Sequence, residues 1–332
     1  MTNRITDPTY VSVSEVRSIL ANGLTPVIQF STDAPPDLLR QVNDLCREFD
    51  DALEVRFYGF YGGAFDADAL RRLPDVANLS VDCLTAIRNE DRLSHLQHLR
   101  KFGLGVHALD RPDILTLLPL DQLTVLSVGQ NARRNIDLAP IARCSALSEL
   151  RISGQTRNIA AIGQLDQLSS LCLHSIAKTQ RLDFVSSMSG LRSLALLLGG
   201  RADIDEVRHD ALETLHIDRV RAFDRLGPLA RFPALRSLRI ADEARLKAID
   251  LLGAQLEAVT LTNCKTLETI AGVTDLPALR SLRVISCPGL DIESMASAVW
   301  PPTLEVLALY SGLARRDTPL RAALDQRGYR EF

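Results

Sequence analysis

The sequence predicts an α/β solenoid, in which short parallel strands and short helical turns repeat along the chain, and three observations lead to this fold class. Leucines recur with a period of 44 residues, divided into units of 21 and 23, between Leu147 and Leu282. Each of these leucines opens the phrase L-x-x-L-x-L or a close variant, as in Leu235 to Ile240. Two positions after the second leucine comes another apolar residue, the spacing of a strand with one buried face.

Eleven rungs follow when the phrases are aligned by their second leucine position, with spacings of 21 to 25 residues. These positions are Leu79, Phe102, Leu126, Leu150, Leu171, Leu194, Leu215, Leu238, Val259, Leu282 and Leu307. We expect the strands to stack as a curved parallel sheet on a concave face. The rest of each rung should return along a convex face as single helical or 3-10 turns, for example at Ile136 to Ala142, Phe223 to Ala230 and Leu267 to Val273.

The convex phrases resemble those of internalin-type and phosphatase-1-regulator-type leucine-rich repeats, which share an I-x-x-I/L-x-x-L segment before the next strand. The resemblance covers about Leu73 to Leu309 and implies a leucine-rich repeat solenoid used as a protein-binding scaffold. One feature departs from that family: the asparagine usual three residues past the second inward strand residue is kept only at Asn131, with cysteine at Cys264 and Cys287. Without this asparagine ladder we expect a less regular curve.

Both ends of the chain read as covers for the exposed ends of a solenoid core. At the N-terminus, a capping box at Ser12 opens a helix that stops at Gly23, and a strand at Pro26 to Phe30, a helix at Pro36 to Phe49 and a strand at Leu53 to Phe57 follow. A short helix at Pro319 to Arg327 is expected to cover the last rung. The predicted organisation is therefore an N-terminal β-α-β capping segment at 1–72, the repeats at 73–312 and a C-terminal cap at 313–332.

Composition limits the classes of partner. The formal net charge of −3 does not favour nucleic acid or membrane binding. Only four of the 38 basic residues are lysines, an arginine bias that we interpret as codon usage in a GC-rich bacterial genome. The first residues lack a signal-peptide pattern, and the six cysteines are scattered without C-x-x-C pairs. These features predict a cytoplasmic protein, and we expect a monomer.

The residue after the first leucine of each late rung lies at the entry edge of its strand. From Leu191 onward this edge row alternates in charge and reads Arg192, Glu213, Arg236, Glu257, Arg280 and Glu305. Opposite charges on adjacent strands can pair laterally, with about 0.2–1 kcal/mol for each exposed pair. We interpret the edge row as a structural device that fixes the register of the rungs, in preference to a partner-binding surface.

The row in the middle of the predicted concave face carries positive charges that do not alternate. Its candidate partner-binding residues, together with one histidine from the neighbouring row, are Arg151, His174, His216, Arg239 and Arg283. A mildly basic strip of this kind suits an acidic protein surface. The alternative is an ordinary solvated face.

A second candidate surface is the aromatic segment that runs from Arg56 to Gly63. Exposed aromatic residues anchor interfaces, and alternation along a strand favours Tyr58 and Tyr61 as its exposed members. Aromatic residues also fill the irregular end of a solenoid core, so burial is the competing interpretation.

No catalytic, cofactor or metal site is predicted. His95 and His98 have no convincing third ligand, and Cys172 with His174 lacks an orienting third group. The leading hypothesis is a non-enzymatic scaffold that binds a folded protein through the concave face, in an immunity, adaptor or regulatory role. The alternative is a bacterial effector that acts on a host protein, or a ubiquitin-ligase-like effector without its catalytic domain, since about 20 residues follow the last rung and none is cysteine.

Overall fold

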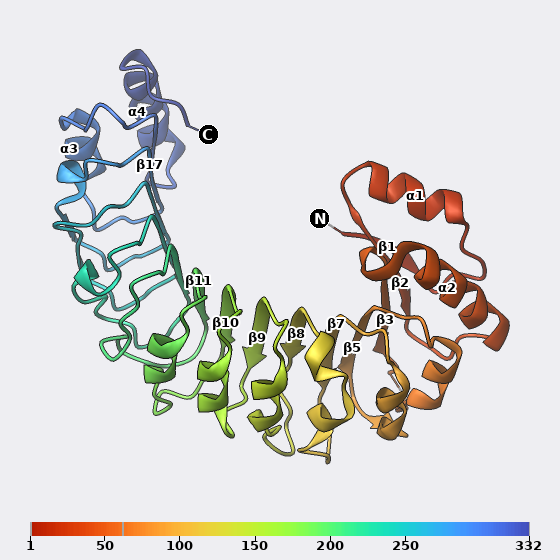
Figure 1. Ribbon diagram of the computed structural model, residues 1–332. Coiled ribbons are helices and arrows are strands. Elements are labelled where there is room, and N and C mark those ends of the chain that lie inside the picture. The colour runs from red at the N-terminus through yellow and green to blue at the C-terminus, as the bar shows by residue number, and fades with distance from the viewer. Residues whose placement is uncertain (1, 62, 332) are drawn as a thin grey trace. The chain divides into compact units, whose positions relative to one another are not determined.

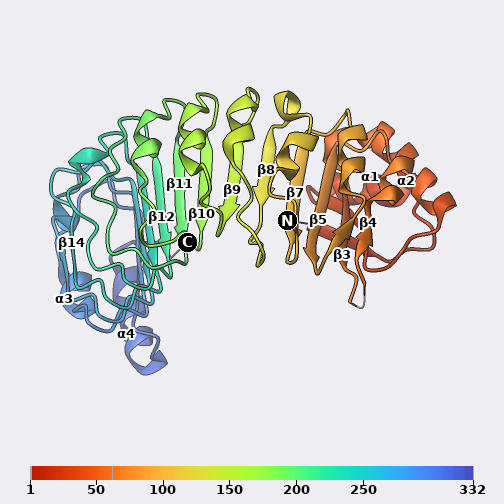
Figure 2. The same cartoon turned by 90° about the horizontal axis from the view of Figure 1, so that it is seen from below.

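The computed structural model describes residues 2–61 and 63–331. Within that part of the chain, fourteen parallel strands form the main sheet. The chain divides into two compact units, Met1–Leu168 and Ser169–Phe332, with seven of these strands in each. Figure 1 shows the strands of each unit side by side, and Figure 2 shows them from below. The predicted leucine-rich repeat solenoid is confirmed.

The first unit contains the strands of the N-terminal segment and the first four rungs. Its main-sheet strands, in spatial order, are β1 (Thr2–Thr6), β2 (Thr25–Phe30), β3 (Glu54–Gly59), β5 (Asn78–Leu84), β7 (Lys101–Val106), β8 (Val125–Val128) and β9 (Glu149–Ser153). The α-helices α1 (Val13–Ala21) and α2 (Pro36–Phe49) connect the first three strands. A two-stranded ladder of β4 (Phe65–Asp66) and β6 (Ile87–Arg88) lies outside the main sheet.

The second unit contains the remaining seven rungs. Its main-sheet strands are β10 (Ser170–His174), β11 (Ser193–Leu197), β12 (Thr214–Asp218), β13 (Ser237–Ala241), β15 (Ala258–Thr262), β17 (Ser281–Ile285) and β18 (Val306–Tyr310). A small separate ladder pairs β14 (Ala248–Asp250) with β16 (Thr269–Ala271). The last elements are the helices α3 (Ile292–Ser297) and α4 (Ala314–Gln326).

Short 3-10 turns lie on most return paths, as predicted at Ile136 to Ala142 and Phe223 to Ala230, whereas the turn predicted at Leu267 to Val273 is wrong because strand β16 pairs with β14 there. The turns are η1 (Asp50–Ala52), η2 (Ala67–Arg72), η3 (Glu90–His95), η4 (Ile114–Leu117), η5 (Leu120–Gln122), η6 (Ala139–Arg143), η7 (Ile159–Gln164), η8 (Asp183–Ser187), η9 (Leu229–Arg231) and η10 (Val273–Asp275). All eleven predicted strand positions fall in strands, and their side chains are no more than 2 % exposed. The core of each unit is therefore the stack of inward residues between the sheet and these turns.

The N-terminal elements agree with prediction except at the first strand. The helices and strands expected between Ser12 and Phe57 are present, and the Ser12 hydroxyl caps α1 by accepting from the backbone N–H of Glu15 at 3.1 Å. Strand β1 was not expected, because Thr2–Thr6 is short and lacks the apolar alternation that marks the other strands. It pairs in parallel with β2.

The C-terminal helix is longer than expected and begins at Ala314 instead of Pro319. The buried carboxylate of Asp317 stabilises the early start, because it accepts hydrogen bonds from Ser311 and from the backbone N–H of Gly312. Pro319 lies inside α4 and has no backbone N–H to donate, yet the helix continues past it to Gln326. Beyond the helix, Arg330 forms a parallel bridge with Val306 and so extends the pairing of β18.

In two rungs another polar side chain takes the place of the missing asparagine. Asn131 bonds the backbone of Leu109 through both atoms of its amide. At the equivalent position one rung later, the amide of Gln155 accepts from the Ile136 N–H at 2.7 Å and donates to the Gly129 carbonyl at 2.9 Å. The backbone groups that asparagine normally satisfies are thus bonded by a longer amide.

Glu243 occupies the same position in the second unit and is fully buried. Its Oε1 accepts from the backbone N–H of Val220 at 2.8 Å, whereas Oε2 has no hydrogen-bond partner among the described residues. Burial, with the nearby carboxylates of Asp218 and Asp242, raises the pKa of Glu243 to about 7. Cys264 follows at the same position of the next rung and is also fully buried.

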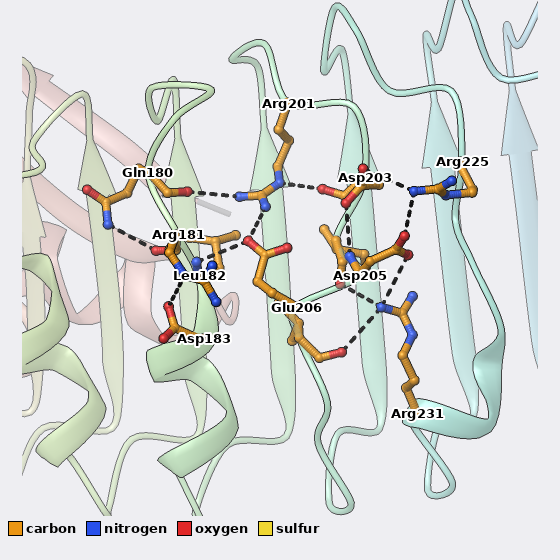
Figure 3. Close-up of polar contacts among 12 residues, drawn as sticks. Gln180, Arg181, Leu182, Asp183, Arg201, Asp203, Asp205, Glu206, Arg225 and Arg231 are labelled. Carbon is orange, nitrogen blue, oxygen red and sulfur yellow. Dashed lines mark hydrogen bonds and ion pairs between the residues drawn. The ribbon is translucent and has the colours of Figure 1, made fainter.

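Two arginines bond the backbone on the return side of the second unit (Figure 3). Buried Arg231 donates to the carbonyl oxygens of Ile204 and Leu226, both at 2.7 Å, and lies 3.6 Å from Asp205. Arg201 donates to the carbonyl of Asp203 at 2.6 Å and pairs with Glu206. Between β11 and β12 the rung has no helical turn, so these guanidinium groups satisfy carbonyls that a helix would otherwise bond.

Replacement of Arg231 by alanine should lower the free energy of unfolding by about 3 kcal/mol, because buried carbonyl oxygens lose their donors. Arg225→Ala is the matched control: its side chain is 62% exposed and also pairs with Asp205, so we expect a loss below about 1 kcal/mol. Urea unfolding followed by circular dichroism measures both. Equal losses in the two variants would contradict the structural role of Arg231.

The stability of the second unit should depend on pH through Glu243. The pKa of its carboxyl rises from an ordinary value of 4.5 to about 7 on folding, so the stabilisation from the protonated form is fully present below pH 4.5. It is lost as the pH rises through 7, by about 3 kcal/mol in total. Glu243→Gln keeps an acceptor for the Val220 N–H and cannot ionise, so its unfolding free energy should vary less between pH 5 and 8.

The matched control for this measurement is Glu268→Gln, since Glu268 is exposed. It should keep the wild-type pH dependence. If Glu243→Gln also keeps it, the buried carboxyl does not control stability in this range.

Candidate binding surface on the open face of the sheet

The outward residues of the second unit form the open face of its sheet. Strand register aligns them in rows, and the middle row consists of Cys172, Ala195, His216, Arg239, Thr260, Arg283 and Ala308. Small residues flank this row on β13, β15 and β17, including Ser237, Ala241, Ala258 and Ser281. The long arginine side chains of this region therefore project from a surface of small side chains.

Arg239 and Arg283 are the charged members of the middle row. They lie on β13 and β17 with β15 between them, which places the two backbones about 10 Å apart. Arg239 is exposed, and the Arg283 guanidinium donates to the Ser281 hydroxyl at 2.9 Å. Neither has a carboxylate partner among residues 2–61 and 63–331. Both guanidinium groups keep donors for an external acceptor.

The edge row behaves differently, as its alternating charges predicted. Arg236 pairs with Glu257 at 2.5 Å, and Arg280 pairs with Glu305 at 3.0 Å. The pair between Arg192 and Glu213 is longer, at 3.6 Å. Lateral pairing of the edge row is confirmed, and its charges neutralise one another.

His216 lies beside Arg239 in register on the neighbouring strand. Its Nε2 is buried, has no hydrogen-bond partner in the part of the chain that the structure describes, and lies 3.9 Å from a carboxylate oxygen of Asp218. Burial is the main cause that lowers the pKa of His216, and the positive charge of Arg239 adds to it. Asp218 also pairs with Arg219 at 3.1 Å. The positive charge of this face at neutral pH therefore comes from the arginines.

The remaining two predicted residues of the strip are separated from this group. His174 ends β10, is partly buried, and aligns with Leu197 of β11. Arg151 is exposed on β9, in register with Ser127 of β8, and therefore belongs to the first unit. The structure brings together His216, Arg239 and Arg283 within one unit.

The aromatic segment of the first unit is divided between core and surface. Phe57 and Phe60 are buried and pack against Phe65, with ring centroids 4.5 and 5.4 Å apart. Tyr58 is partly buried, and the Arg56 guanidinium lies 4.8 Å from its ring centroid. Tyr61 is 86% exposed. The predicted exposure is confirmed for Tyr61, whereas Tyr58 is largely engaged by its own strand.

One feature at the carboxyl end of β11 was missed from the sequence. Leu198 follows β11, is 37% exposed, and has a backbone φ of +58°. A bulky side chain rarely adopts this left-handed conformation, which costs leucine roughly 1–2 kcal/mol. The signal in the sequence was the run of leucines at 196–198, which breaks the alternation of the strand just before two glycines.

Neither metal clusters nor membrane helices were found where the structure describes the chain. No group of three or more histidine, cysteine or acidic residues could hold a metal ion within residues 2–61 and 63–331. In the same residues, no helix combines the length and apolarity needed to cross a bilayer.

Comparison with known proteins supports the fold. No protein-family model and no curated protein sequence matches the chain. Among solved structures, the chain is similar to the Toll–Spatzle complex of Drosophila, with a TM-score of 0.54, 15% identity, and coverage of 92% of this chain and 45% of that chain. It is also similar to an internalin (inlF) of Listeria monocytogenes, with a TM-score of 0.45, 16% identity, and coverage of 98% and 85%. This chain thus spans less than half of the matched chain of the Toll–Spatzle complex.

Replacement of Leu198 by asparagine should raise the free energy of unfolding by about 0.5–1 kcal/mol, because asparagine tolerates a positive φ. Chemical denaturation of the purified protein measures the change. Leu252→Asn is the control, since Leu252 is 64% exposed and is not among the residues with positive φ. A loss of stability in Leu198→Asn would show that the leucine stabilises the isolated protein.

Proposed function

We propose that this leucine-rich repeat protein is a non-enzymatic scaffold that binds the acidic surface of one folded protein through the open face of its second unit. The observation that supports the proposal is the contrast between the two rows of arginines. Those of the edge row pair with glutamates, whereas Arg239 and Arg283 of the middle row have no carboxylate partner in the described chain.

The chemistry of this face suits carboxylates. A guanidinium presents a planar set of donors that matches a carboxylate with two parallel hydrogen bonds. Because the arginines stand on a sheet whose backbone is fixed by pairing on both sides, little conformational entropy is lost when a rigid partner docks. The small serine, threonine and alanine side chains around the arginines allow the partner to approach the sheet closely.

The biological role that we propose is immunity, adaptor or regulatory binding in the cytoplasm. A reducing compartment is supported by the cysteines, all six of which are free thiols. Cys46, Cys144, Cys264 and Cys287 are buried and act as small apolar residues.

Affinity capture from a lysate of the source organism tests the proposal. A double variant, Arg239→Glu with Arg283→Glu, should retain at least tenfold less of any protein that the wild type captures, because the reversed charges repel an acidic surface. A second double variant, Arg245→Glu with Arg315→Glu, makes the same change in net charge at two exposed arginines outside the sheet and should capture as the wild type does.

Equal capture by all three proteins would contradict binding at this face. Loss of the same partner on Tyr61→Ser would instead locate the interface in the first unit. Thermal unfolding of each variant confirms that a loss of binding is not a loss of fold.

A further inference from the structure

We infer that Leu197 and Leu198 form an apolar anchor for the protein partner, at the carboxyl end of β11 beside the basic arginines. The anchor would take an exposed leucine or phenylalanine of the partner that is flanked by carboxylates. This inference rests on the proposed function, because it concerns the same open face, and it adds the feature that determines specificity.

The left-handed conformation of Leu198 is imposed by the repeat. Each main-sheet strand of the second unit before β18 is followed by one residue with φ between +54° and +58°, namely Ser175, Leu198, Arg219, Asp242, Asn263 and Ser286. In each case the backbone N–H of this residue donates to a carbonyl of the next rung, as Leu198 does to Asp218 at 2.8 Å. The rung therefore requires this backbone whatever side chain is present.

Among the six residues of this series, Leu198 has the side chain that does least to offset the left-handed backbone. Arg219 pairs with Asp218 and Asp242, and Asn263 donates to Asp242. Serine is small and polar. In the first unit Phe60 also has a positive φ, but it is 8% exposed and packs against Phe65. Leu198 is a bulky residue in the same backbone region, yet more than a third of its side chain faces solvent.

A strained conformation that is not offset inside the protein points to a role outside it. An exposed leucine beside another partly exposed leucine also meets the description of an interface anchor: apolar, near charges, and surrounded by polar groups that complete the seal. Leu197 lies between His174 and Asp218 in register, and Leu198 precedes the glycine pair Gly199 and Gly200.

The surrounding charges define the partner. Arg239 lies two strands from β11, about 10 Å across the sheet, and two residues before Ala241, the residue of β13 in register with Leu197. Asp218 and Asp242 share the guanidinium of Arg219, which offsets one of their two negative charges, so the carboxylate of the partner should lie on the side toward Arg239. An apolar side chain on Leu197 and Leu198 would therefore place a neighbouring carboxylate of the partner within reach of Arg239.

A displayed library of folded three-helix domains, randomised on one face, is the probe for this inference. Domains selected on the wild-type protein should be enriched in leucine or phenylalanine together with aspartate or glutamate. Their affinity should fall at least tenfold on Leu198→Asn, which fits the backbone but removes the apolar contact, and should not change on Leu252→Asn.

The same domains are then measured on the double variant Arg239→Glu with Arg283→Glu. Loss of affinity on both Leu198→Asn and this variant supports the anchor and the proposed function together. Loss on the arginine variant alone overturns the anchor and leaves the proposed function standing. Loss on Leu198→Asn alone supports the anchor and contradicts the basic face, and selected domains that respond to neither variant, or no selected domains, overturn both.

Discussion

The structure depends on one constraint: every rung must return the chain to the same register on the sheet, one strand spacing further along. Parallel backbone pairing and the stack of inward leucines both require this repeat. A solenoid has no single centre, so a rung that failed to close would break the core between its neighbours. Residue choices elsewhere in the chain are consequences of this requirement.

At the position after each main-sheet strand, the repeat fixes the backbone conformation but allows side chains of different chemistry. The left-handed residue recurs with almost the same φ in six successive rungs, although its side chain varies from serine to arginine. The next residue along the rung is the asparagine position, which is apolar or glycine in the first three of these rungs and Glu243, Cys264 or Cys287 in the last three. Glu243 is the costly choice among them, because one carboxyl oxygen satisfies the backbone and the other is buried without a partner.

Much of the fold was predictable because leucines and other apolar residues recur at short, regular spacings along the chain. The eleven strands were found from the second leucine of each phrase, and the N-terminal helices from a capping box and an apolar stripe. Strand β1 was missed because its residues carry no alternation, and the start of α4 because the buried bonds of Asp317 cannot be read from a chain that also contains Pro319. Arg201 and Arg231 were invisible for a similar reason: an arginine on a return path looks solvent-exposed until the carbonyls around it are seen.

The candidate surface was predictable only in outline. The alternation of inward and outward residues along each strand identified which arginines face outward. The sequence could not show which of them pair with carboxylates, because the ion pairs of a long side chain depend on the three-dimensional positions of its neighbours. The structure separates the two rows by a short distance along each strand. In the edge row, arginines and glutamates on adjacent rungs form ion pairs with one another. In the middle, Arg239 meets Thr260 on one side and a neutral histidine on the other.

This division explains where binding can evolve on a repeat protein. Inward residues are fixed by the core, and the edge row contributes to register, so substitutions there affect the fold. The middle row is under neither demand, and its residues differ from rung to rung. Leu198 combines both situations. The fold requires its left-handed backbone conformation, and that conformation is unfavourable for a leucine side chain. A residue that the architecture would replace with asparagine or glycine is the best available mark of a contact that the isolated chain does not contain.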